Sequence, residues 1–165
     1  MRSYCLFCKT GSEKEIAQKV NQIYHGVNAI APMRVCPYKL KGKWEYREQA
    51  LLPGYVFLFT EGELRDKLPS DVSNAYKLLE YASGQKELQG ADYNYSMWVY
   101  RNHGRIDTSK VLTQGKRVKV IQGPLSDGFG RIVKLDRHKR RVWVEFDFDG
   151  QKRIVSLGAE CVKAE

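Results

Sequence analysis

Leu51-Leu52-Pro53-Gly54-Tyr55-Val56-Phe57-Leu58-Phe59 is the most apolar and aromatic stretch of the chain. Nine residues are too few for a membrane-spanning helix, and β-branched and aromatic residues after a Pro-Gly pair indicate a strand. Strand alternation places Leu51, Tyr55, Phe57 and Phe59 on one face, and Leu52, Val56 and Leu58 on the other. Both faces are apolar, so the strand needs two covers. Either helices cover both faces or another protein covers one, and composition favours neither arrangement.

The charge of the chain indicates polyanionic partners. Its 165 residues carry 28 Lys and Arg against 19 Asp and Glu, a net charge of +9 with a pI near 9.4. This excess is large enough to steer binding to nucleic acid. The sequence has no signal-peptide core and no apolar run of membrane length. We therefore expect a cytoplasmic protein, a monomer, with no membrane partner.

Two of the four cysteines, Cys5 and Cys8, form a Cys-x-x-Cys motif. That spacing suits a redox pair at the start of a helix, or half of a zinc site when a second pair follows. Here the motif lies in a predicted strand, where residues three apart face opposite ways, and no second pair exists. We interpret these side chains as thiols in a reducing compartment and expect no metal or cofactor.

The first hundred residues alternate between strand and helix patterns. Ser12 and Glu15 fit a capping box at the start of a helix, and Pro69 is expected to end a later one. The predicted elements are a strand at 3–10, a helix at 13–25, an edge strand at 29–38, the central strand at 51–59 to which residues 44–50 lead back, a short helix at 61–68, a strand at 75–81 and a helix at 91–102. This order predicts an α+β fold with an antiparallel sheet.

A lysine-rich turn, Lys39-Leu40-Lys41-Gly42-Lys43, separates two of these strands. Such a tip would be able to contact nucleic acid. Lysine-rich turns are more often simply solvated, and we adopt that interpretation.

The pattern changes after residue 103. A polar segment at 104–112 is interpreted as a linker between domains 1–103 and 113–165. Beyond it, strands are predicted at 117–122, 131–135, 141–148, 151–156 and 161–163, with turns at Gly123-Pro124, Asp127-Gly128 and Asp149-Gly150. Short strands this closely spaced predict a small β-barrel. Residues 113–165 hold 12 basic and 7 acidic side chains, so the smaller domain carries more than half of the net charge.

Two motifs resemble the NusG family of transcription elongation factors. The stretch 51–57 resembles the central strand motif of its NGN domain, with Pro32 at the place of a proline in the preceding strand. The stretch 115–125, followed by Gly128 and Gly130, resembles a KOW motif. The resemblance covers the chain in order and spacing. Departures near the N-terminus and at 79–92, together with the basic second half, favour a specialised paralogue of the RfaH, UpxY or LoaP kind, most like LoaP.

The resemblance implies that the first domain docks on the clamp region of RNA polymerase and suppresses pausing. By motif position, Tyr55 and Phe57 would be docking aromatics, with Leu52 and Phe59 as neighbours. Rigid aromatic rings contribute much of the contact free energy of an interface at small entropic cost. The apolar outer face of the central strand would then be the surface for polymerase.

In the second domain, Val142, Val144, Phe146 and Phe148 are expected to point inward, which leaves Arg141, Trp143 and Glu145 outward. Lys and Arg neutralise phosphates, and an exposed indole stacks on an unpaired base. For Trp143, capping of a neighbouring strand is an equal alternative. The predicted RNA-binding residues are Lys116, Arg117, Lys119, Arg131, Lys134, Arg137, His138, Lys139, Arg140, Arg141, Trp143, Lys152 and Arg153.

No catalytic constellation is found in the sequence, and we expect no enzyme. The predicted function is processive elongation or antitermination, in which the second domain binds a nascent RNA hairpin. One alternative is an RfaH-like factor recruited by DNA of the transcription bubble through the first domain. Another is a KOW protein that binds ribosomal RNA.

Overall fold

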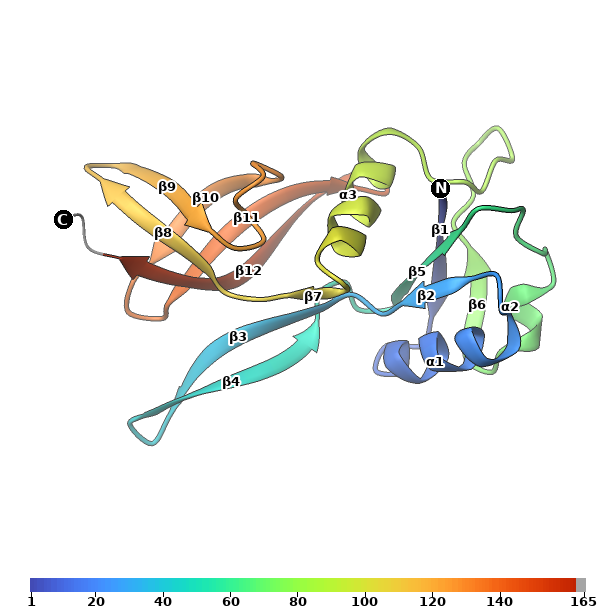
Figure 1. Ribbon diagram of the computed structural model, residues 1–165, viewed down its shortest axis with the longest axis horizontal. Helices are drawn as coiled ribbons and strands as arrows, with labels where there is room; N and C mark the ends of the chain where they lie inside the picture. Colours follow the sequence, from blue (N-terminus) through green and yellow to red (C-terminus); the bar gives the residue numbers. More distant parts are fainter. Residues whose placement is uncertain (163–165) are drawn as a thin grey trace. The chain divides into compact units, whose positions relative to one another are not determined.

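The structure is a computed structural model that describes residues 1–162, and its chain divides into two compact units. Unit 1 comprises residues 1–32 and 52–104. Unit 2 comprises residues 33–51 and the described chain from residue 105 onward. Each unit is therefore built from two separate stretches of sequence (Figure 1). The sequence predicts domains 1–103 and 113–165, whereas compactness groups residues 33–51 with the second unit. The boundary at 104–112 therefore stays a prediction.

Unit 1 is an antiparallel sheet with helices, as the α+β prediction requires. Its elements are β1 (Arg2–Cys8), α1 (Glu13–Ile23), β2 (Asn28–Ile30), β5 (Tyr55–Thr60), α2 (Leu68–Asp71), β6 (Ala75–Leu78) and α3 (Gly90–Arg101). The strand order is β2-β5-β1-β6, and each neighbouring pair is antiparallel. The strand predicted from the apolar stretch, β5, is therefore hydrogen-bonded on both edges.

One face of β5 packs against α1 and α2. Val56 and Leu58 are fully buried there, in a cluster to which the apolar side of α1 and the first residue of α2 also belong. Its other members include Tyr4, Leu6, Cys8, Ile16, Ala17, Val20, Ala29, Leu68, Val72 and Leu78. This face is the main core of unit 1.

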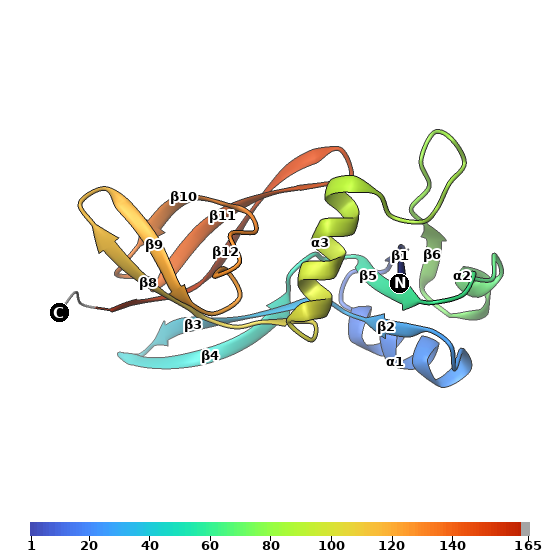
Figure 2. The same cartoon turned by 45° about the horizontal axis from the view of Figure 1, so that its top comes forward.

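The opposite face of β5 packs against α3. The ring of Phe57 lies 6.0 Å from that of Tyr95, and the ring of Phe59 lies 4.9 Å from that of Tyr100, centroid to centroid. A hydrogen bond of 2.8 Å between the hydroxyls of Ser3 and Ser96 holds α3 to β1 on this same face. The sheet thus lies between α1 and α3 (Figure 2).

The start of α1 is stabilised by Glu13 rather than by the predicted capping box. The Ser12 side chain makes no capping hydrogen bond, and its backbone (φ −106°, ψ 8°) lacks the extended conformation of a typical N-cap. The buried Glu13 carboxylate instead accepts hydrogen bonds from the backbone N–H of Gly11, at 2.9 and 3.1 Å, and of Gly54, at 3.1 Å. It joins the start of α1 to the turn that precedes β5.

The prediction that Pro69 ends a helix at 61–68 is wrong. The short helix α2 runs over Leu68–Asp71, with Pro69 in its first turn. The first backbone N–H groups of a helix have no partner within the helix, so a proline there sacrifices no hydrogen bond. Among the described residues, no helix is both long enough and apolar enough to span a membrane.

Unit 2 consists of strands. They are β3 (Met33–Leu40), β4 (Lys43–Ala50), β7 (Arg105–Ile106), β8 (Ser109–Gln114), β9 (Arg117–Gln122), β10 (Arg131–Asp136), β11 (Arg141–Phe148) and β12 (Gln151–Val162). One sheet has the order β4-β3-β7 and the other has the order β10-β11-β12-β8-β9. The segment 104–112, expected as a linker, thus contains β7 and the first part of β8.

The five-stranded sheet shows the predicted small barrel only in part. Its pairings in the described chain run from β10 to β9, and no pairing described here joins those two strands. The inward residues of β11 are as predicted, since Val142, Val144, Phe146 and Phe148 are all buried. The sheet is therefore a half-barrel around the apolar face of β11.

Strand β12 is continuous where two short strands, 151–156 and 161–163, were predicted. The last residue of the second predicted strand lies outside the described residues. Gly158, which stands between the two predicted strands, lies within β12, where an added Cβ would collide with Thr108 Oγ1 and lie 3.0 Å from Pro37 Cδ. Glycine here permits close approach of neighbouring chain rather than ending the strand.

Gly130 is another glycine that packing requires. Its φ is +82°, and an added Cβ would lie 2.5 Å from the Phe146 ring and 2.7 Å from a Val144 methyl group. Gly128, in the same loop, has a φ of +77° but no atom within 4 Å of its added Cβ. Both glycines have a positive φ that would strain any other residue, but only Gly130 is closely packed.

We expect Gly130→Ala to lower the free energy of unfolding by about 2–5 kcal/mol, because left-handed backbone strain adds to overpacking. Gly128→Ala, the matched control, should lower it by only about 1–2 kcal/mol, from backbone strain alone. Urea unfolding followed by circular dichroism measures both. Equal losses in the two variants would contradict the packing of β11 described above.

Candidate nucleic-acid interface

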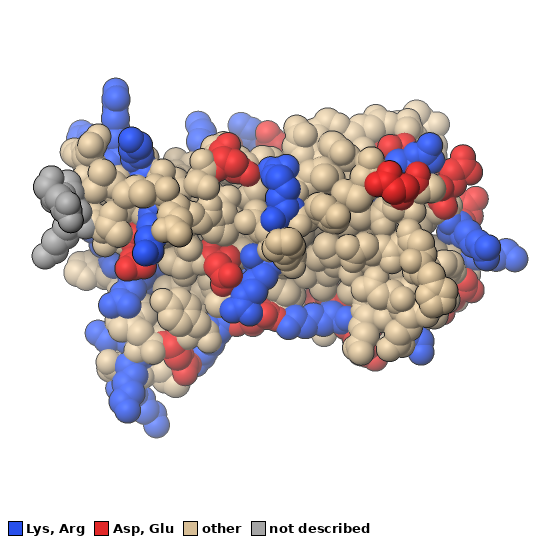
Figure 3. Space-filling model, in the orientation of Figure 1, with Lys and Arg blue, Asp and Glu red and all other residues tan. Residues whose placement is uncertain are grey.

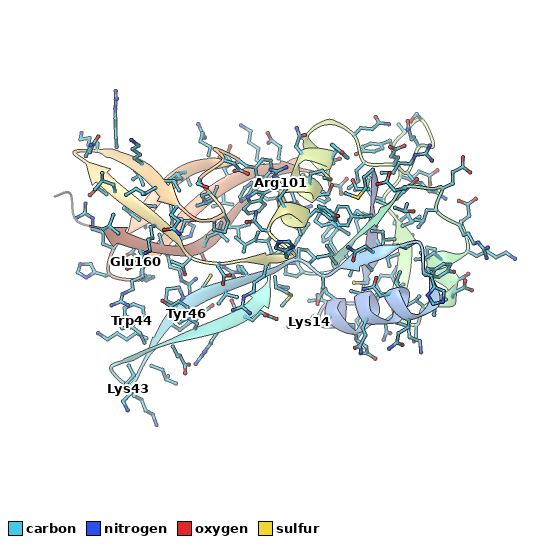
Figure 4. All side chains as sticks on the ribbon, in the orientation of Figure 1. Lys14, Lys43, Trp44, Tyr46, Arg101 and Glu160 are labelled. Atoms are coloured by element: carbon cyan, nitrogen blue, oxygen red, sulfur yellow. The ribbon has the colours of Figure 1, made fainter. Side chains whose placement is uncertain are left out.

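The hairpin β3–β4 carries the lysine-rich turn at its tip. Lys41 and Gly42 both have positive φ, at 51° and 77°, as a two-residue hairpin turn of type I′ requires. The register places Lys39 opposite Trp44, and Lys39 Nζ lies 6.0 Å from the centre of the Trp44 ring system. Figure 4 shows Lys43, Trp44 and Tyr46 along β4.

Arg141 attaches this hairpin to the five-stranded sheet. Its Nε and Nη2 donate to the Pro37 carbonyl oxygen at 3.2 and 3.0 Å, and its Nη1 donates to Ser156 Oγ at 3.0 Å. The prediction that Arg141 points outward to contact RNA is wrong, because the side chain is buried. Hydrogen bonds from a charged donor are among the stronger ones in proteins, so this contact is a structural link. Arg34 of β3 adds a hydrogen bond of 2.9 Å to Ser156 Oγ.

Two arginines lie against the Tyr38 ring. The guanidinium carbon of Arg141 lies 4.4 Å from the ring centroid, and that of Arg47 lies 5.1 Å from it. The Tyr38 hydroxyl donates to Gln49 Oε1 at 2.6 Å. Both ends of the side chain are thus fixed within unit 2.

The hairpin and the sheet enclose a groove of about 530 Å³, which we call the hairpin groove. It is lined by Pro37, Tyr38, Lys39 and Trp44 from the hairpin and by His138, Lys139, Arg141 and Trp143 from the turn before β11 and from β11 itself. Figure 3 shows Lys and Arg side chains (blue) gathered at the tip of the hairpin. The groove therefore combines aromatic walls with positive charge.

Cations lie against both tryptophans of the hairpin groove. The guanidinium carbon of Arg140 is 4.1 Å from the centre of the Trp44 ring system, and Lys134 Nζ is 5.2 Å from that of Trp143. Each tryptophan remains partly exposed. Guanidinium and ammonium groups are attracted to the face of an indole, so these contacts help to orient both side chains.

The turn between β10 and β11 is shaped by Asp136. Its carboxylate accepts a hydrogen bond of 3.0 Å from the backbone N–H of Lys139, which holds the pKa of Asp136 below its usual value. The Arg140 backbone N–H donates to the Arg137 carbonyl oxygen at 3.3 Å, and Arg140 has a φ of +53°. These bonds define the turn from which His138 and Lys139 reach the groove.

The structure brings six of the predicted RNA-binding residues together. Lys134, His138, Lys139, Arg140, Arg141 and Trp143 line the hairpin groove or contact its tryptophans. The other predicted residues do not line it: Lys116, Arg117, Lys119, Arg131, Arg137, Lys152 and Arg153. The predicted RNA-binding residues therefore do not form one surface: six lie at the hairpin groove and the other seven lie apart from it.

Several of those separate positions are engaged elsewhere. Arg131 Nη2 and Lys152 Nζ lie 3.2 and 3.6 Å from the Glu145 carboxylate. Arg137 donates to Thr113 Oγ1. The Arg153 guanidinium carbon lies 5.7 Å from the centroid of a phenylalanine ring, that of Phe148. The ion pairs with Glu145 offset part of the charge that phosphates would otherwise meet.

Sequence reasoning missed the contribution of the hairpin. The lysine-rich turn was interpreted as solvated, whereas Lys39 and Trp44 line the groove. An aromatic residue directly after a lysine-rich turn is a signal that was present in the sequence. Its partners are about a hundred residues away, and no local pattern encodes that contact.

The predicted polymerase-docking residues are mostly core. Leu52, Phe57 and Phe59 are buried in unit 1, with at most 3% of their surface exposed. The prediction that these side chains are offered to a partner is wrong, because α3 covers Phe57 and Phe59 and because Leu52 is itself buried. Tyr55 alone of the four is partly exposed, with its ring 5.0 Å from and edge-on to that of Phe7.

The cysteine motif lacks the environment of a reactive pair. Cys5 and Cys8 are both buried on β1. Burial, and next the nearby Glu13 carboxylate, raises the pKa of Cys8 from 9.0 to about 11. Reactive thiols have lowered pKa values, so Cys8 is in the opposite situation. Among residues 1–162, no group of three His, Cys, Asp or Glu side chains is placed to hold a metal ion.

Of the comparisons with known proteins, the one with solved structures finds a similarity. No family model and no curated protein matches the chain. Among solved structures, one that describes domain interaction in Thermotoga maritima NusG has a TM-score of 0.52 and 19% sequence identity. The alignment covers 95% of this chain and 93% of that chain. At this identity the likeness shows that the chain has a fold similar to NusG.

We expect Cys8 to resist alkylation while Cys161, which is exposed, reacts readily. Iodoacetamide at pH 8 followed by peptide mass spectrometry should find Cys161 modified, and Cys8 modified only after unfolding in urea. Comparable rates at the two thiols in the folded protein would contradict the raised pKa.

The same pKa shift gives a pH dependence of stability. The folded state holds the Cys8 proton more tightly than the unfolded state, so this contribution is full below pH 9.0 and is lost as the pH rises to about 11. Cys8→Ala should remove this part of the dependence from urea-unfolding curves measured across the range.

Proposed function

We propose that this protein is a transcription elongation factor that docks on RNA polymerase through unit 1 and binds nucleic acid through unit 2. The fold similarity to NusG supports this class over nearly the whole chain. The observation that carries the proposal is the hairpin groove, where two tryptophans and several basic side chains face one concave surface. Aromatic side chains interleaved with cations are typical of surfaces that bind nucleic-acid strands.

The nucleic acid of the proposal is a hairpin in the nascent RNA, as for a paralogue of the LoaP kind. The C-terminal segment 113–165 supports this choice, because it holds 12 basic and 7 acidic residues in about a third of the chain length. Binding of an RNA hairpin near its own operon would tether the factor to the polymerase that made it. Elongation would then continue through terminators.

On unit 1, the proposed polymerase contact is the partly exposed pair of Tyr55 and Phe7. Their rings meet edge to face at 5.0 Å, and Lys77 Nζ lies 5.8 Å from the centroid of the Phe7 ring. A partly exposed, rigid aromatic pair beside a cation resembles the anchor residues of protein interfaces. The remaining predicted docking residues, Leu52, Phe57 and Phe59, are buried and are not part of this proposed contact.

We expect Tyr55→Ala to reduce readthrough of an intrinsic terminator by about tenfold or more, the usual effect of truncating an interface anchor. Binding to RNA should persist in this variant. Tyr55→Phe, the matched control, keeps the ring and should keep most of the readthrough. Transcription in vitro with purified polymerase measures this, and full readthrough with Tyr55→Ala would remove Tyr55 from the docking surface.

RNA binding should fall steeply with added salt, because phosphate contacts release counterions. Replacing Lys139 and Arg140 together by alanine should flatten the slope of log affinity against log salt concentration by about 0.7 for each phosphate that is no longer neutralised. Replacing Lys14 and Lys19 together by alanine is the matched control, since both are exposed on α1 of unit 1 and do not line the groove. Gel shifts at several salt concentrations test this, and an affinity that is indifferent to salt would refute it.

A further inference from the structure

Two of the three tryptophans of the chain lie in the hairpin groove. Trp98 is fully buried in α3, as expected for a core residue. Trp44 and Trp143 are instead partly exposed and line the same concave surface, although they are about a hundred residues apart in sequence. An indole left partly exposed inside a groove offers a flat apolar surface to a ligand.

The walls of the groove are held in place by protein contacts. Arg141 bonds to the Pro37 carbonyl oxygen and to Ser156 Oγ, and its guanidinium also lies against the Tyr38 ring. These contacts connect the hairpin that carries Trp44 to the strand that carries Trp143. A preformed site loses little conformational freedom when it binds, which favours affinity.

The chemistry of the groove selects a base rather than a duplex. Duplexes present phosphates and sugars at their surface, and their base faces are stacked inside. A base that is unpaired exposes its face, and stacking on an aromatic side chain then stabilises binding. Lys39 and Lys139 line the same groove and are suited to the phosphates on either side of such a base.

We propose that the hairpin groove is a site for an unpaired nucleobase, stacked on Trp44 or Trp143, and that hairpin β3–β4 supplies one half of it. This inference rests on the proposed nucleic-acid binding and specifies its ligand: a loop or single strand instead of a helical stem. The unpaired base can come from RNA or from DNA, and the experiment separates these sources. Arg141 is a positioning residue in this site.

The test uses the full chain and its tryptophan fluorescence. The probes are a 10-nucleotide single-stranded RNA, the DNA of the same sequence, a blunt 10-base-pair RNA duplex, and an RNA stem-loop with either normal or abasic loop nucleotides. Single strands and the normal stem-loop should quench fluorescence and bind at least tenfold more tightly than the duplex and the abasic stem-loop. Trp98 supplies a constant background, because it is buried.

Alanine at whichever tryptophan carries the base, Trp44→Ala or Trp143→Ala, should weaken single-strand binding by about 5- to 150-fold, the range for stacking of one base, and leave duplex binding unchanged. Tyr46→Ala is the matched control: Tyr46 is 64% exposed on the same strand as Trp44 but does not line the groove. Circular dichroism checks the fold of each variant. The abasic comparison on the unaltered protein tests the site even if a variant misfolds.

Equal affinities for single strand and duplex, without quenching, would overturn the base site and leave the proposed RNA binding standing. Absence of binding to every probe would overturn both. Quenching by RNA, DNA or both supports the base site, and the tighter of the two identifies the source of the base.

Discussion

The structure of unit 1 depends on the need to cover β5 on both faces. Full burial of a large apolar side chain is worth about 1.5–3 kcal/mol, so neither face of this strand is stable in water. Helices α1 and α2 cover Val56 and Leu58, and α3 covers Phe57 and Phe59. The chain's own helices therefore cover both faces of β5, although composition alone is equally consistent with another protein covering one face. Of the four predicted docking residues, Tyr55 keeps a partly exposed ring, next to Phe7 of β1.

In unit 2, the effect of each basic residue depends on the oxygen it meets. Arg141 donates to a carbonyl and a hydroxyl oxygen, which are neutral, so its positive charge is retained beside the hairpin groove. Arg131 and Lys152 instead pair with the Glu145 carboxylate, which offsets their charge. Basic residues thus produce a strong local positive potential only where their N–H groups donate to neutral oxygens rather than to carboxylates. Arg141 of the hairpin groove meets this condition although it is buried, whereas Lys134 and Lys139 lie near the Asp136 carboxylate.

Local patterns in the sequence predicted the elements whose periodicity is set by neighbouring residues. The strand β5, the helix α1 and the inward alternation of β11 are of this kind. Features that depend on distant contacts were not predictable in the same way. Glu13, rather than Ser12, stabilises the start of α1, partly through its hydrogen bond with the distant Gly54. Gly158 lies within β12, where Thr108 and Pro37 pack too closely for any side chain. Basic residues in the sequence likewise do not reveal which of them share a groove.

The hairpin groove exists only when both of its halves are present. A two-stranded hairpin is at best marginally stable in water, so the position of Trp44 depends on the sheet to which Arg141 attaches β3. A fragment of residues 113–165 would keep the turn from Arg137 to Arg140 and also Trp143, but it would lack Trp44 and most of β8, which pairs with β12. Such a fragment retains the phosphate-binding charge and loses one stacking surface together with part of its own sheet. The complete base site is therefore a property of the whole chain, and nucleic-acid affinity measured on the C-terminal segment alone lacks the contribution of Trp44.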